Sequence, residues 1–268
     1  MSLFGNKKLP KPPTYPIHDM VDDAINVIMA SSYIARNREY LEKMERVEFV
    51  YTPEMIANSF ANYAGNKSYK VYTFEGLSLL ICTCAAVFTV YTKNHDLHQV
   101  KRALKWLFDK SLYEVEAYND EWEAVDEEKI DEFYKKFPEY RVKEYYPQYM
   151  ELGRKMIAFV LGHEIGHIML GHMDRTNGIS NNVSRNNERS CDLFSCSILQ
   201  GTGFGSSFAE GAVFLTLIFF FMDTTKYRNH QYGTHPGHKD RVMNMVQSFK
   251  NELMYANISE NDIMNLMR

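Results

Sequence analysis

The chain has 268 residues, of which 45% are hydrophobic and 24% are charged, and its formal net charge at pH 7 is −4. This length and composition indicate one globular domain with a sizeable core. Because there is no basic excess to meet phosphates, nucleic acid is not expected as a partner. The four cysteines form neither a disulfide framework nor paired C-x-x-C zinc spacing, which favours a reducing, cytoplasmic location.

Residues 1–18 combine lysines with four prolines, and no apolar segment of a secretory signal follows them. We expect a flexible, proline-rich tail here. A tail that occupies a cleft as a pro-segment is the alternative. The remainder, residues 19–268, is expected to form a single helical domain, with a region of unknown role at 19–150 and a catalytic core at 151–250.

The first part of this domain carries mixed signals. Apolar residues at helical spacing predict one or two helices over 19–47. Thr52, followed by a proline, has the pattern of a helix start and predicts a helix to about residue 63. A turn is expected at 65–68 and a short strand at 69–74.

Two strongly apolar segments lie at 77–91 and 211–222. The first, at about 15 to 17 residues, falls short of the roughly 20 needed to cross a bilayer. We therefore expect two buried core helices, the second packed beside the metal-binding helix described below. Membrane association is not expected. A membrane-associated enzyme anchored by 77–91 is the alternative.

Residues 96–111 have an apolar stripe opposite basic residues and predict an amphipathic helix. The acidic stretch 114–132 is typical of a solvated helical face. Binding of a basic substrate is the alternative for that stretch. Aromatic residues are frequent over 133–149, where packing is the expected role and a wall of a substrate groove is the alternative.

The stretch 156–172 predicts an apolar helix that contains His163-Glu164-x-x-His167. Histidines four residues apart lie on one helical face and can direct their ring nitrogens at a common point. Zn²⁺ takes such ligands, with room left for a third protein ligand and for water. Glu164 would then take a proton from that water for attack on a peptide carbonyl. The alternative is a core helix with hydrogen-bonded histidines.

A third ligand is expected from the next helix. His172 follows His163 by nine residues, one short of the spacing in the three-histidine motif. Glu188 and Asp192 are four apart and share a helical face, after a loop-like segment over 174–186. Glu188 can therefore bind the metal while Asp192 accepts the N–H of a ligating histidine.

Over residues 155–245 these elements resemble the gluzincin metallopeptidases of the HtpX-like and CAAX prenyl endopeptidase group. The resemblance includes Thr234-His235-Pro236 and Arg241, which come after the metal-binding helix and its acidic partner. It departs from that group at Cys191, where a small residue is usual, and in the lack of convincing membrane spans. A weaker similarity is to Lit-type phage-exclusion peptidases, soluble H-E-x-x-H proteins that cleave a host factor when triggered.

The resemblance implies Zn²⁺ held by His163, His167 and Glu188, with Glu164 as general base. It also implies that His235 and Arg241 approach the site and stabilise the oxyanion. The expected fold is mainly α, a multi-helix zincin-like domain with at most a small β element. Pro236 suits the first turn of a helix running to about residue 253.

The sequence thus predicts a zinc-dependent endopeptidase that cleaves a protein or peptide substrate. A binding or regulatory module in which zinc only holds helices together is the alternative. A structural zinc has four protein ligands, whereas catalysis needs an open position. His172, His235 and His238 are the candidates for such a fourth ligand.

Overall fold

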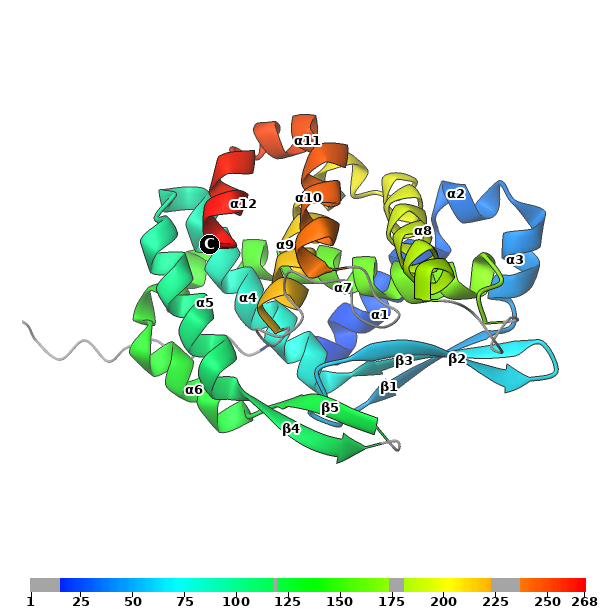
Figure 1. Ribbon diagram of the computed structural model, residues 1–268, viewed down its shortest axis with the longest axis horizontal. Coiled ribbons are helices and arrows are strands. Elements are labelled where there is room, and N and C mark those ends of the chain that lie inside the picture. The colour runs from blue at the N-terminus through cyan, green and yellow to red at the C-terminus, as the bar shows by residue number, and fades with distance from the viewer. Residues whose placement is uncertain (1–14, 118–119, 174–180, 223–236) are drawn as a thin grey trace, which may run out of the picture.

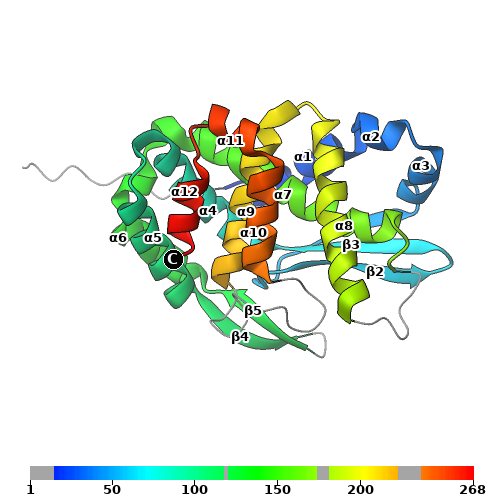
Figure 2. The same ribbon diagram turned by 45° about the horizontal axis from the view of Figure 1, so that its top comes forward.

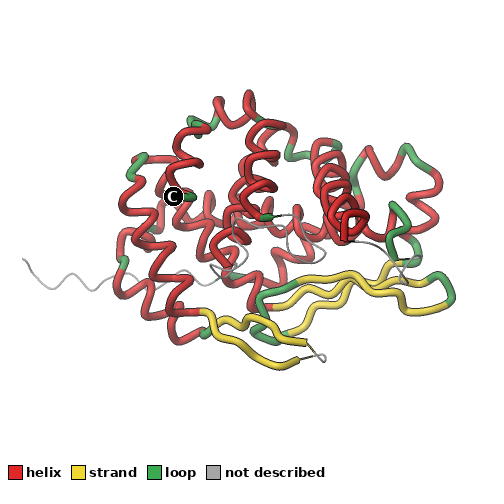
Figure 3. The backbone as a smooth tube through the Cα atoms, viewed as in Figure 1, coloured by secondary structure: helices red, strands yellow, loops and turns green. Residues whose placement is uncertain are grey.

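A computed structural model describes residues 15–117, 120–173, 181–222 and 237–268. The fold is mainly α with two small sheets, as predicted, and the strands gather on one side of the helices (Figures 1 and 3). Most of the predicted tail, residues 1–14, lies outside the described residues.

The N-terminal region forms three helices, where the sequence predicts one or two. They are α1 (Ile17–Met29), α2 (Ser32–Ala35) and α3 (Arg38–Met44). The breaks have a local cause, because Ser31 and Asn37 act as N-caps. The side chain of Ser31 accepts the Tyr33 N–H, and that of Asn37 accepts the N–H groups of the first turn of α3.

The larger sheet has the strand order β1-β3-β2, with β1 parallel and β2 antiparallel to β3. The strands are β1 (Val47–Thr52), β2 (Ser59–Gly65) and β3 (Ser68–Phe74). The turn and the strand expected over 65–74 are confirmed, whereas the helix predicted over 52–63 is wrong. Backbone groups of residues 55–57 bond to the smaller sheet instead, through Ala57 N to Glu123 O and Val125 N to Met55 O, both 2.7 Å. These tertiary bonds override the local helix signal.

Both apolar segments form core helices, α4 (Glu75–Asn94) and α9 (Phe208–Met222). The Phe88 and Phe214 rings stack between them, with centroids 4.2 Å apart. α4 has 20 residues and is longer than predicted. By length and composition, α4 and the segment Gly205–Met222 are each able to cross a membrane, but 83% of the apolar window of α4 is buried inside the protein.

The next elements are α5 (Leu97–Ser111), β4 (Leu112–Ala117), β5 (Asp120–Val125), α6 (Glu127–Lys136) and the short 3-10 helices Pro138–Arg141 and Lys143–Tyr145. α5 is as predicted, with Asp96 as its N-cap. The acidic stretch is helical only in its second half, because its first half forms the β4–β5 hairpin beside the larger sheet (Figure 2). The aromatic side chains of 133–149 that are fully buried belong to the core, as the packing interpretation predicts.

The central helix is α7 (Tyr146–Met169), and α8 (Asn181–Gln200) packs across it. Two glycines of α7 permit the approach: a Cβ at Gly162 would lie 2.5 Å from Ser195 Oγ, and one at Gly166 would lie 3.1 Å from Cys191 Cα. α8 begins within the segment predicted as loop. The chain ends in α10 (His238–Ser248), α11 (Lys250–Tyr255) and α12 (Glu260–Leu266), so the helix predicted to residue 253 is divided at Phe249.

Candidate metal centre

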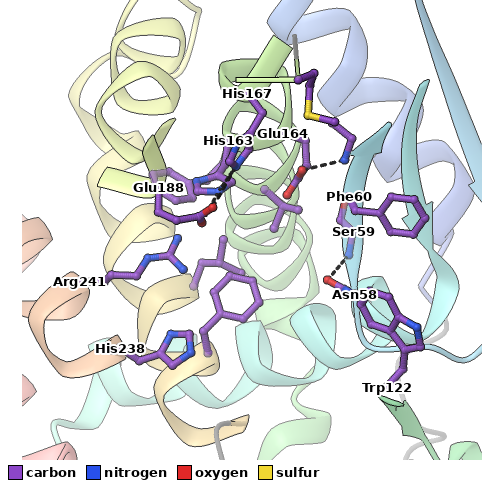
Figure 4. A pocket seen from close by; sticks show the side chains of 16 residues that line it. Asn58, Ser59, Phe60, Trp122, His163, Glu164, His167, Glu188, His238 and Arg241 are labelled. Carbon is purple, nitrogen blue, oxygen red and sulfur yellow. Dashed lines mark hydrogen bonds and ion pairs between the residues drawn. The ribbon is translucent and has the colours of Figure 1, made fainter. Parts of the chain in front are cut away.

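Side chains from α7 and α8 bring three ligand atoms together (Figure 4). His163 Nε2 lies 3.3 Å from His167 Nε2 and 3.3 Å from Glu188 Oε2, and His167 Nε2 lies 3.4 Å from Glu188 Oε1. Ligands bound tetrahedrally at about 2.0–2.1 Å are separated by about 3.3–3.4 Å. The three groups therefore fit a zinc-sized ion, with two imidazole nitrogens and a carboxylate as donors.

Asp192 fixes the ring of His163. His163 Nδ1 lies 2.9 Å from Asp192 Oδ1, and Arg241 donates to the same carboxylate from Nε (3.0 Å, to Oδ2) and Nη2 (2.6 Å, to Oδ1). With Nδ1–H donating to Asp192, a neutral His163 presents the lone pair of Nε2 to the other two donors. The carboxylate thus sets the orientation and tautomer of a candidate ligand.

The electrostatics of the cluster favour a positive charge between its donors. Burial would raise the pKa of Asp192, but Arg241 and His163 outweigh it and lower the pKa to about 2. Burial would also lower the pKa of His163, yet the bonds to Asp192 and Glu188 raise it to about 10. A cation that replaces the proton on His163 would meet the same negative partners.

Glu164 lies beside the three ligand atoms, and a backbone N–H of the larger sheet binds its carboxylate. Its Oε2 accepts the N–H of Ala61 in the edge strand β2, at 2.9 Å (Figure 4). Burial raises the pKa of Glu164 to about 7, against the opposing influence of His163. A carboxylate with such a pKa can both accept and return a proton near neutral pH.

The cluster opens into a cavity of about 510 Å³. The metal-ligand candidates and Arg241 form one side, and Phe60 of β2 and Trp122 of β5 form the other (Figure 4). The two aromatic rings stack with centroids 6.0 Å apart. Sequence reasoning missed this wall, although the turn at 65–68 followed by a strand was a signal for a hairpin that includes β2.

The structure brings most, but not all, of the sequence-predicted site residues together. His163, Glu164, His167, Glu188, Asp192 and Arg241 are brought together, whereas His235 lies outside the described residues. His238 lines the cavity. His172 contacts Cys191 instead, with Nδ1 3.4 Å from Sγ. Within the described ranges, no fourth His, Cys, Asp or Glu atom joins the three-donor group.

Arg241 lines the cavity and also makes contacts that the sequence did not predict. Two of its guanidinium nitrogens are bound to Asp192, and the guanidinium lies 5.8 Å from the centroid of the Phe219 ring. Its role as an oxyanion donor stays a prediction, while its contacts are those of a group that positions Asp192.

A comparison with protein families matches residues 73–257 to Peptidase U49. The matched segment contains the three donors, Glu164, Asp192 and Arg241, and it excludes β2. No curated protein and no solved structure matches the chain.

Proposed function

Because the chain belongs to the peptidase U49 family, the family of the Lit-type peptidases, we propose that it is a zinc-dependent endopeptidase that acts on a protein substrate. The observation that carries this proposal is the convergence of His163, His167 and Glu188 at the spacing that zinc requires, with Glu164 beside them. The family supports peptide-bond hydrolysis, and the geometry supports the metal and the residue roles.

When bound, Zn²⁺ would polarise the scissile carbonyl and lower the pKa of water in the site. Glu164 would accept the proton of the attacking water on its carboxylate and then donate it to the leaving amine. Its pKa of about 7 suits both transfers. Asp192 would hold His163 in the ligating tautomer, and Arg241 would hold Asp192.

The substrate would lie extended along β2. This is an edge strand, and its Ala61 N–H points away from β3 toward Glu164. An exposed strand edge can pair with a peptide through main-chain hydrogen bonds. Phe60 and Trp122 would then contact substrate side chains from the wall opposite the metal ligands.

Among related activities, the family match favours a Lit-type peptidase that cleaves a host factor over a processor of the HtpX-like or CAAX type. We propose a cytoplasmic location, which the four free and buried cysteines support. A zinc that only holds helices together would need a fourth protein ligand, and the described part of the chain offers none at the three-donor group.

The experiment is a comparison of Glu164→Gln with the wild type and with Glu151→Gln, a control on the partly exposed part of α7. Cleaved peptides are mapped without bias in a cell lysate, and zinc content and Tm are measured for each variant. Glu164→Gln should abolish cleavage and leave zinc content and Tm nearly unchanged, whereas Glu151→Gln should cleave as the wild type does.

His163→Ala serves as the second arm and should lose the bound zinc. Intact zinc stoichiometry in His163→Ala would contradict the assigned ligands. Cleavage by Glu164→Gln at the wild-type rate would contradict the assigned general base.

A further inference from the structure

A second group of metal-binding side chains lies beside the first. His167, His172 and Cys191 each offer a ligand atom, and these atoms all lie within 4.8 Å of one another. The His172 Nδ1 to Cys191 Sγ distance is 3.4 Å, and the rings of His167 and His172 are edge to face with centroids 5.4 Å apart. The mechanism proposed above uses neither His172 nor Cys191.

The fold builds this group from the end of α7 and the middle of α8. After α7 ends, the backbone N–H of His172 donates to His167 O at 2.9 Å, which holds the turn against the helix. Gly166 has no side chain, and a Cβ there would lie 3.2 Å from Cys191 Sγ. The Cys191 thiol therefore packs directly against Gly166 of α7, the residue before His167. His167 and His172 are half-buried, so the group is not sealed from solvent.

The distance between His172 Nδ1 and Cys191 Sγ fits a metal ion bound by both atoms. Zinc bonds of about 2.0–2.1 Å to nitrogen and 2.3 Å to sulfur place the two ligand atoms about 3.5 Å apart. A set of two imidazoles and one thiolate selects ions that tolerate soft ligands, such as Zn²⁺, Co²⁺ and Cd²⁺. Burial raises the pKa of the Cys191 thiol, so without a metal the sulfur stays protonated against His172.

We propose that His167, His172 and Cys191 form a second metal-binding site that takes a thiophilic divalent ion through the Cys191 thiolate. Binding forms a metal–sulfur bond and releases the thiol proton to solvent. This site goes beyond the proposed peptidase activity. Its consequence for activity rests on that proposal: His167 belongs to both groups, so an ion at the second site competes for a catalytic-site ligand and inhibits the enzyme at excess metal.

The test is a Co²⁺ titration of the full chain under reducing conditions, followed through the near-ultraviolet absorption of a thiolate–cobalt bond. The wild type should develop this band. Cys191→Ala should lack it, and His172→Asn should lose it or require much more Co²⁺. Cys196→Ala is the matched control, a second buried cysteine of α8 that belongs to neither group, and it should retain the band.

Absence of the band at every Co²⁺ concentration in the wild type would overturn the proposal, as would a band that persists in Cys191→Ala. Loss of the band in Cys196→Ala would also overturn the proposal, because Cys196 belongs to neither group. Circular dichroism of each variant excludes loss of the fold as the cause, and His172→Asn changes a half-buried side chain that the fold should tolerate.

Two further measurements separate this site from the catalytic one. Glu188→Gln removes a ligand of the first group only, so it should lose the catalytic zinc and still show the thiolate band. Peptidase activity should fall several-fold at excess Zn²⁺ in the wild type and not in Cys191→Ala. If no peptidase activity is found but the band behaves as expected, the proposed function fails and this site stands. If Glu164→Gln abolishes cleavage but no thiolate–cobalt band forms, the proposed function stands and this second site fails.

Discussion

Asp192 is the residue on which the geometry of the candidate metal centre depends most. It is 2% exposed and accepts hydrogen bonds from both His163 and Arg241. Removing one partner of a buried ion pair costs roughly 3–5 kcal/mol, because the other charge stays buried without compensation. The candidate centre is therefore held by contacts that run from Arg241 on α10 through Asp192 to His163 on α7.

Arg241→Lys distinguishes two roles for this guanidinium. Lysine keeps the charge and loses the planar fork that binds both oxygens of Asp192. If Arg241 positions Asp192, zinc affinity should fall about 10–100-fold while kcat of the zinc-saturated enzyme changes little. If Arg241 is an oxyanion donor, zinc affinity should stay constant and kcat should fall about 10²–10³-fold. Chelator competition and initial rates at saturating zinc measure the two quantities, and we expect the first result.

At the scale of elements, the helices could be predicted from sequence wherever a local pattern decides the structure. α5 has an apolar stripe and the capping residue Asp96, and α4 is a continuous apolar run. The candidate metal ligands on α7 were predictable for the same reason, since helical spacing places His163 and His167 together. Glu188 was predictable as a third candidate ligand because it lies on the helix that follows α7 in the chain.

The strands that complete the site were not predictable in this way. Thr52-Pro53 has the pattern of a helix start, but the bonds that decide the structure of the next residues come from β5, about 70 positions later. In β4 the acidic residues alternate with Val115, and this alternation of period two was obscured by the charge of the segment. The aromatic wall of Phe60 and Trp122 joins two such strands, so local reasoning could not assemble it.

The packing of α9 against α7 predicts a pH-dependent stability. Glu210 of α9 lies 3.9 Å from Lys155 Nζ of α7, with Glu151 and Lys93 nearby. Burial raises the pKa of Glu210 more than Lys155 lowers it. The folded state therefore binds this proton more tightly than the unfolded state, so the stability from Glu210 is present below its ordinary pKa of 4.5 and is lost as the pH rises through the folded pKa.

Glu210→Gln removes this ionisation, so the Tm of the variant minus that of the wild type should be higher at about pH 8 than at about pH 4. Thermal melts of both proteins across this range measure the difference. Glu45→Gln, an exposed carboxylate after α3, is the control and should give no such trend. A Tm difference that is the same at both pH values would contradict the titration of Glu210 as its cause.

At the scale of the whole molecule, one hydrophobic cluster extends from Ile17 in α1 to Leu266 in α12. α7 lies at its centre and packs against α1, α4, α8 and α9. α7 therefore buries its apolar surface against both the N-terminal region and the C-terminal helices. The β2 wall of the cavity also comes from the N-terminal region. Residues 19–150 are thus part of the structure that forms the site.

This arrangement predicts that residues 151–268 do not fold alone. Without α1 and α4, the fragment would expose the apolar surface of α7 that packs against both helices, as around Gly153, where Met20 of α1 and Cys82 of α4 lie close. Each large apolar side chain left in water costs about 1.5–3 kcal/mol, and a few of them equal the whole stability of a typical domain. The fragment should be insoluble or lack a cooperative melt, whereas the full chain should unfold in one calorimetric transition with equal calorimetric and van't Hoff enthalpies. A soluble fragment that melts cooperatively and binds zinc would instead establish a separate catalytic domain, and two resolved transitions in the full chain would support the same division.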